Sequence, residues 1–161
     1  MNIHEALRTR RTIHHFSRDP VPLDRVRAAV EAAVLAPNHR LTEPWRFLLL
    51  GRGARGPVAD LAVEIKAHRD GAPLPAEMES RIRGKILDPF FALLVRCIRA
   101  EDPIQRAEDR SAVACAVQNL FLSLHGHGIG SKWSTGGFVR HPRLYEVLNL
   151  DPADGEVEGI I

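Results

Sequence analysis

The sequence predicts a domain in which one β-sheet carries helices on its faces. Apolar residues recur at helical spacing over residues 23–34, and a mostly apolar run at 90–98 is typical of a strand buried on both faces. Residues 108–127 contain no Pro, and no Gly before Gly126, which predicts one long helix. The length of 161 residues fits a single domain over residues 1–161.

The elements before the apolar run are expected to alternate between helix, loop and strand. Asn2 and Glu5 have capping-box spacing, so a short helix should open the chain and end near Arg10. Pro57 suits the first turn of a helix that follows a glycine-rich turn. In order, we expect a loop at 11–16, a helix from 23 to Pro37, a polar loop at 38–45, a strand at 46–50, a turn at 51–56, a helix from Pro57, a loop at 69–76 and a charged helix at 77–85.

The long helix at 108–127 is apolar on nearly all sides. Its core face is formed by Val113, Ala116, Val117, Leu120, Phe121 and Leu124, yet Ala114 and Cys115 are apolar too. Such a helix is buried on several sides. In so short a chain, this favours a helix that is shared with a partner subunit. A loop around Trp133, a helix from Pro142 and a strand at 157–161 should follow.

The composition excludes several classes of protein. The net charge of +2 is too weak to indicate nucleic-acid binding by itself, and the longest unbroken apolar run, at 90–95, is too short to span a membrane. Cys97 and Cys115 both lie in apolar runs, so we expect buried free thiols in a reducing compartment. Without a visible signal peptide, the expected location is the cytoplasm.

Two polar clusters in the first part of the chain could bind a ligand. Arg10, Arg11 and Thr12 follow a short helix, and such a group can hold a phosphate through charge-assisted hydrogen bonds. The alternative is a solvated basic turn. Asn38 and His39 lie in a polar loop between helix and strand, a common ligand position that can also be an ordinary connection.

A third cluster is the glycine-bearing loop at 128–137. It is no dinucleotide fingerprint, because a helix precedes it where that motif needs a strand. Its glycines can let backbone N–H groups approach a planar ligand closely, or they can simply end the long helix.

Metal and nucleophile chemistry have little support. Neighbouring His14 and His15 point apart on an extended segment, and His125 and His127 do not share a helix face. No carboxylate or Cys accompanies either pair, so we expect no metal site. The sequence has no Gly-x-Ser-x-Gly elbow, although a Ser-His-Asp triad stays open.

Taken together and in order, the three clusters resemble the nitroreductase family, and most closely its short members. The resemblance covers nearly the whole chain. It rests on Arg10-Arg11-Thr12, then Ala36-Pro37-Asn38-His39 leading to Pro44-Trp45, then an Ala-rich helix with Asn119-Leu120, and finally Trp133-Ser134-Thr135-Gly136.

The resemblance implies a fold, an assembly and a cofactor. The fold would be an α+β, three-layer sandwich with a mixed central sheet flanked by helices. The assembly would be an obligate homodimer with two flavin mononucleotide (FMN) sites at the interface. By resemblance, Arg10, Arg11 and Thr12 would hold the phosphate and ribityl chain, and Asn38 and His39 would come from the partner subunit. The remaining implied contacts are Trp133, Ser134, Thr135 and Gly136 along the isoalloxazine, with the backbone of Thr135, Gly136 and Gly137 near flavin N5.

The implied activity is a two-step oxidoreduction. NADH or NADPH would reduce FMN, which would then reduce a nitroaromatic, a quinone or another electron-poor small molecule, with no side-chain acid or base required. Three features depart from the family pattern. His14 stands where many members place Arg or Lys near the flavin, Glu43 replaces a Gln, and the family's final strand and tail beyond Ile161 are apparently missing. These departures motivate an alternative, a non-catalytic flavin-binding or scaffold protein with the same fold.

Overall fold

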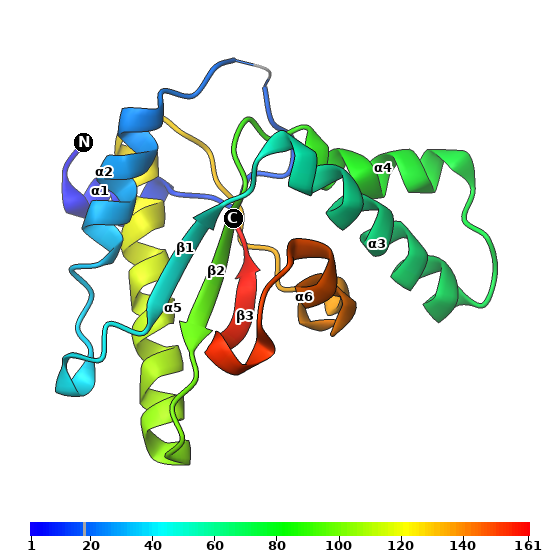
Figure 1. Ribbon diagram of the computed structural model, residues 1–161. Coiled ribbons are helices and arrows are strands. Elements are labelled where there is room, and N and C mark those ends of the chain that lie inside the picture. Colours follow the sequence, from blue (N-terminus) through cyan, green and yellow to red (C-terminus); the bar gives the residue numbers. More distant parts are fainter. Residues whose placement is uncertain (18) are drawn as a thin grey trace.

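The computed structural model describes residues 1–17 and 19–161 (Figure 1). Its helices are α1 (Ile3–Thr9), α2 (Leu23–Ala33), α3 (Arg52–Asp70), α4 (Ala76–Leu87), α5 (Pro103–Gly126) and α6 (Arg143–Leu148). Its strands are β1 (Trp45–Leu49), β2 (Leu93–Ile98) and β3 (Gly155–Ile160), and three short 3-10 turns are η1 (His39–Leu41), η2 (Gly137–Arg140) and η3 (Pro152–Asp154).

The three strands form one antiparallel sheet with β2 in the centre. Trp45 of β1 lies opposite Cys97, and Ile160 of β3 lies opposite Leu94. The mixed sheet expected from the resemblance is corrected here, since the strands of the described residues all pair antiparallel. The reason lies in the connection between β1 and β2: α3 and α4 form a helical hairpin that returns the chain to the end of the sheet where β1 finished (Figure 1).

The sheet separates two apolar cores, which confirms the three-layer α+β fold. Alternate residues of β2 point to opposite faces. Leu93, Val95 and Cys97 pack with α2 and α5, whereas Leu94 packs with α3 and α6 on the other face. Figure 1 shows the same arrangement, with α2 and α5 on one side of the strands and α6 on the other. The buried strand predicted at 90–98 is therefore confirmed over Leu93–Ile98, whereas Phe90, before the strand, is exposed.

Capping residues explain where the first and the longest helices begin. The Asn2 side chain accepts a hydrogen bond from the Glu5 backbone N–H, as the capping-box spacing predicted. Asp102 caps α5 in the same way, through the backbone N–H of Ile104. α5 therefore begins at Pro103, earlier than expected, because a proline fits the first turn directly after a cap.

Two further expectations from the sequence were wrong. Residues 51–56 do not form a turn: α3 already begins at Arg52, and Pro57 lies inside it. Arg55 is buried there and donates to the carbonyl oxygens of Ile86 and Pro89, so tertiary contacts outweigh the local turn signal. Cys115 is exposed, unlike Cys97, because it lies on the face of α5 that points away from α2 and the sheet. Within the described ranges, no helix is long and apolar enough to cross a membrane.

Candidate functional site

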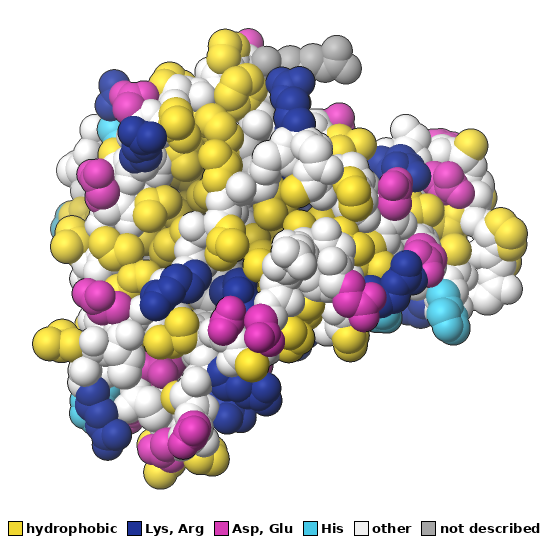
Figure 2. Space-filling model, viewed as in Figure 1, with side chains coloured by type: hydrophobic (Ala, Val, Ile, Leu, Met, Phe, Trp, Pro, Cys, Tyr) yellow, Lys and Arg dark blue, Asp and Glu magenta, His cyan; other side chains and the backbone are white. Residues whose placement is uncertain are grey.

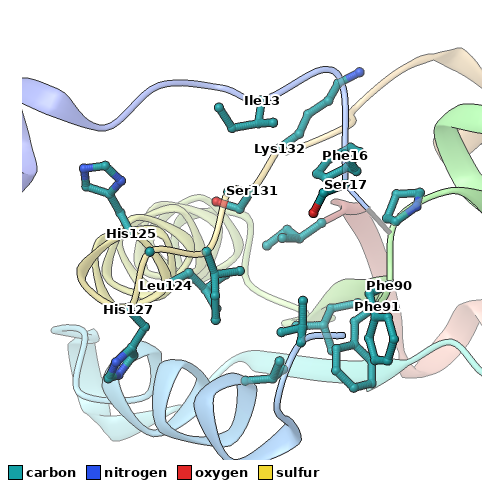
Figure 3. A pocket seen from close by; sticks show the side chains of 18 of the residues that line it. Ile13, Phe16, Ser17, Phe90, Phe91, Leu124, His125, His127, Ser131 and Lys132 are labelled. Carbon is teal, nitrogen blue, oxygen red and sulfur yellow. The ribbon is translucent and has the colours of Figure 1, made fainter. Parts of the chain in front are cut away.

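A cavity of about 850 Å³ lies beside the ends of β2 and β3, where the chain after α1 meets the chain after α5. Its volume is within the range of about 300–1,000 Å³ that is typical of small-molecule and cofactor sites. In Figure 3, Phe90 and Phe91 lie on one side of the cavity and His125 and His127 on the other. Phe16 and Ser17 complete the upper wall, with Lys132 beside them.

The first and third sequence clusters come together at this cavity. Thr12 forms an isolated parallel bridge with Ser131, and the backbone N–H of Ile13 donates to the carbonyl oxygen of Ser131 over 3.1 Å. A Cβ atom on Gly130 would lie 2.8 Å from Cγ1 of Ile13, so the close approach of the two segments requires glycine at this position. Arg10 and Arg11 consequently line the same cavity as Ser134, which is far from them in the sequence.

Two guanidinium groups at the cavity are available to an anion. The Arg10 guanidinium carbon lies 5.3 Å from the centre of the Phe121 ring, which holds the group in place. Arg11 donates to the carbonyl oxygens of Arg8 and Arg10. Neither group is among the ion pairs that the described residues form with carboxylates. The arrangement fits an anionic ligand such as a phosphate.

The glycine-bearing loop adds hydrogen-bond donors next to the cavity. Ser134 pairs with Ile160 through two backbone hydrogen bonds, of 2.7 and 3.0 Å, which fixes this loop to the edge of β3. The next three residues, Thr135, Gly136 and Gly137, are exposed. In the described part of the chain, their N–H groups make no hydrogen bond to a backbone oxygen. Fixed, unpaired N–H groups of this kind can bind a ligand that has acceptor atoms at its edge.

Of the ten cofactor-binding residues predicted from the sequence, Arg10, Arg11 and Ser134 line the cavity. The other seven do not: Thr12, His14, Asn38, His39, Trp133, Thr135 and Gly136. Thr12 and His14 are exposed and do not line it, whereas His15 does. The Trp133 indole packs against the core around α5, and its buried Nε1 has no hydrogen-bond partner among the described residues.

Several cavity residues were not predicted from the sequence. Phe90 and Phe91 meet edge to face with their ring centres 5.0 Å apart, and they form an aromatic wall. Lys85 and Lys132 also line the cavity. Burial, together with the nearby charge of Lys85, lowers the pKa of Lys132. The adjacent Phe residues at the start of an apolar run were the one sequence signal that could have indicated this wall.

The second cluster, Asn38 and His39, lies at the opposite end of α5. His39 pairs with Glu108 at 2.8 Å, near the start of α5, whereas Arg10 packs on Phe121 near its end. At a rise of about 1.5 Å per residue, Glu108 and Phe121 are about 20 Å apart along the helix. Within one protomer, Asn38 and His39 therefore lie far from the cavity.

The loop that carries Asn38 and His39 has an unusual backbone. Arg40, Leu41 and Glu43 have φ angles of 58°, 53° and 43°, in the left-handed region. This conformation costs about 1–2 kcal/mol for a residue other than glycine. The Asn38 side chain closes the loop by accepting a hydrogen bond from the Glu43 backbone N–H.

The fold and the cavity define an α+β protein with a cation-lined ligand site at one end of its sheet. The chain belongs to the nitroreductase family, whose pattern it matches over residues 7–161. It is 39% identical to a chloronitrobenzene nitroreductase of Comamonas testosteroni, and the match covers 98% of this chain and 84% of that protein. It is also 30% identical to YfhC of Bacillus subtilis strain 168, which bears the name of an NAD(P)H nitroreductase, over 92% of this chain and 76% of that protein.

Solved structures share the fold. A nitroreductase-like protein of Bacillus cereus superposes with a TM-score of 0.81 at 26% identity, covering 99% of this chain and 83% of that one. An iodotyrosine deiodinase, solved with FMN and 3-iodo-L-tyrosine, superposes with a TM-score of 0.79 at 21% identity and covers 98% of this chain and 85% of its own.

Proposed function

We propose that this chain is an FMN-dependent oxidoreductase that takes electrons from NADH or NADPH. The observation that carries the proposal is that Arg10 and Arg11, which form no ion pair with a described carboxylate, line the same cavity as Ser134. The loop that continues from Ser134 adds three backbone N–H groups that donate to no backbone oxygen among the described residues. The guanidinium groups suit a phosphate, and the N–H groups suit the polar edge of a planar ring. Relatives in the same family bear nitroreductase names, which supports the same class of reaction.

The residues fit FMN in charge, and the cavity of about 850 Å³ is in the size range of cofactor sites. Arg10 and Arg11 would hold the phosphate, with Ser131 beside the ribityl chain. Thr12 does not line the cavity and would contribute through its bridge to Ser131. Ser134 and the N–H groups of Thr135, Gly136 and Gly137 would face the ring system. Bound FMN supplies the redox chemistry itself, by accepting a hydride from a nicotinamide and passing electrons to an acceptor. The protein contributes binding, orientation and fixed dipoles.

A homodimer would complete the site. Two copies related by a two-fold axis across the middle of α5 would pack these helices antiparallel, which exchanges their ends. Asn38 and His39 of each copy would then lie near the cavity of the other. Exposed apolar residues on the surrounding elements support this assembly, and Figure 2 shows hydrophobic side chains gathering where α2 lies. The most exposed are Met1 (64%), Leu35 (81%), Leu41 (83%) and Ile104 (71%).

Other parts of the proposal concern the acceptor, the domain and the location. Nitroaromatics and quinones are the acceptors we propose, because the aromatic wall of Phe90 and Phe91 lines the cavity, and Phe16 lines it as well. Residues 1–161 would form a single flavin-binding domain. A cytoplasmic location stays a prediction.

The exposed position of His14, away from the cavity, favours a second candidate, a flavin-binding protein without turnover. The deciding experiment is anaerobic titration of the FMN-loaded protein with NADH or NADPH while the visible flavin spectrum is recorded. Loss of the yellow band, and its return on adding a nitroaromatic or a quinone, is the expected result. A bound flavin that keeps its colour would establish the second candidate, and a protein that binds no FMN would contradict both.

A further inference from the structure

The Asp109 carboxylate is buried and is not used by the proposed chemistry. Asp109 lies on α5 and is 1% exposed. Its Oδ1 atom accepts hydrogen bonds from the Thr42 hydroxyl at 2.7 Å and from the Gln105 amide at 2.9 Å. In the part of the chain that the structure describes, no cation lies within ion-pair distance of it. Burying a carboxylate is unfavourable unless hydrogen bonds satisfy it. The hydrogen bonds to Asp109 are therefore expected to have a structural role.

The partner of Asp109 belongs to the strained loop at 38–43. Thr42 follows η1 directly and lies between two of the left-handed residues, Leu41 and Glu43. Contacts at the tip do not compensate for this strain, because Leu41 is 83% exposed and Arg40 is exposed as well. Strained backbone persists only where the surroundings over-determine it, and it is common at ligand-binding sites.

Two anchors on adjacent residues of α5 hold this exposed loop. The Thr42 hydroxyl reaches Asp109, and His39 reaches Glu108. The loop is therefore fixed to the helix that we place at the subunit interface, and its tip projects outward. A loop held rigid and exposed in this way is arranged to contact something outside its own protomer.

We propose that Asp109 is a positioning residue, which holds the loop at 38–43 through Thr42 so that Asn38 and His39 reach the flavin cavity of a second copy of this chain. The inference rests on the proposed function. It assigns Asp109, Thr42 and Gln105 a role that cluster patterns in the sequence did not indicate.

Matched variants separate the hydrogen bond from the shape of the side chain. Thr42→Val keeps the shape but removes the hydroxyl, and Thr42→Ser keeps the hydroxyl. Asp109→Ala removes the acceptor, and Asp109→Asn keeps an oxygen that can accept from Thr42. We expect Thr42→Val and Asp109→Ala to weaken FMN binding about tenfold, whereas Thr42→Ser and Asp109→Asn stay close to wild type.

Two readouts distinguish positioning from simple stabilisation. The visible circular dichroism of bound FMN reports the surroundings of the ring, and trypsin cleavage after Arg40 reports the order of the loop without any flavin. Thr42→Val should change the dichroism and speed cleavage after Arg40, while cleavage after Arg69 in α3 stays unchanged. A lower melting temperature with the same FMN affinity, dichroism and Arg40 cleavage would overturn the proposal.

Mixing two defective variants tests whether the loop acts on the second copy. In a mixed dimer of Arg10→Ala and Thr42→Val chains, the Thr42→Val subunit has an intact cavity and receives an intact loop from its partner. One of the two sites should therefore regain wild-type FMN affinity. No recovery in mixed dimers would show that the loop serves its own cavity and would refute the proposal. A wild-type protein that binds no FMN would refute the proposed function, and this inference with it.

Discussion

The backbone of Gly159 lies directly against the indole of Trp133: a Cβ atom on Gly159 would be 2.1 Å from Nε1 of Trp133. The same atom would be 2.9 Å from the carbonyl oxygen of Ser134. Gly159 also has a φ of 157°, which side chains rarely adopt. Trp133 and the glycine-bearing loop are therefore seated on β3 by the absence of a side chain at this position.

Replacing Gly159 with Ala should displace Trp133 and loosen the loop. Overpacking typically costs about 1–3 kcal/mol, and the left-handed conformation adds to it. We expect a lower free energy of unfolding, a shifted Trp fluorescence spectrum and weaker FMN binding, measured by chemical denaturation and flavin titration. Gly53→Ala is the control, because a Cβ atom there meets no atom within 4 Å and Gly53 lies in a helix. Equal effects of the two changes would show that Trp133 is not seated as described.

Replacing Arg10 with Ala should weaken FMN binding roughly ten- to a hundredfold, the loss expected when a hydrogen bond to a charged group of about 1.5–3 kcal/mol is removed. Arg10 faces the cavity, whereas Arg8 is exposed and does not line it. Arg8→Ala is therefore the control, measured by the same fluorescence titration. Arg18, predicted to matter as little as Arg8, lies outside the described residues. Similar losses at Arg8 and Arg10 would indicate diffuse charge instead of a phosphate site.

The two thiols should report the homodimer. Cys115 is exposed on α5 within one protomer, whereas burial raises the pKa of the Cys97 thiol to about 12. Because the reactive form is the thiolate, Cys97 should resist a thiol reagent at pH 8. If α5 lies in an interface of roughly 2,000 Å² or more, as obligate homodimers have, Cys115 should be protected too and both should react only after denaturation. A folded monomer at low micromolar concentration with a freely reactive Cys115 would contradict the dimer.

Local patterns predicted much of the fold. Asn2 and Glu5 act within one turn, and the apolar run at β2 records burial on both faces, so neighbouring residues carry the information. The start of α3 was mispredicted because it depends on Arg55 reaching the carbonyl oxygen of Pro89, far along the chain. The exposure of Cys115 was mispredicted because an apolar residue on α5 can face a partner instead of the core of its own protomer.

The site was partly predictable for the same reason. Arg10 and Arg11 are adjacent, so the sequence showed them as a cluster. Phe90 and Phe91 line the cavity together with residues that are distant in the sequence, so no local pattern predicted their role. The left-handed backbone at Arg40 and Leu41 has no glycine to indicate it. Tertiary anchors hold that backbone, and no pattern within the loop shows them.

Replacing Gly136 with Val should impair flavin binding while leaving the fold intact. Gly136 has φ −62° and ψ 168°, an extended conformation that Val adopts readily, and a Cβ atom there meets only a Phe138 ring carbon at 3.9 Å. Stability should therefore stay within about 0.5 kcal/mol of wild type. The added methyl groups would keep the ring system away from the N–H groups of Thr135, Gly136 and Gly137, and losing one or two such hydrogen bonds corresponds to about tenfold weaker binding or more.

Gly136→Ala provides the graded comparison for this change, since its single methyl group should have a smaller effect on FMN affinity. The rate of anaerobic reduction by NADH should fall in the same order, because fixed amide dipoles stabilise the negative charge that the flavin gains. A folded Gly136→Val protein with wild-type affinity and reduction rate would show that these glycines merely end α5 and turn the chain. A liganded structure with the ring system more than about 6 Å from all three N–H groups, well beyond hydrogen-bond range, would lead to the same conclusion. The phosphate site at Arg10 would then stand on its own evidence.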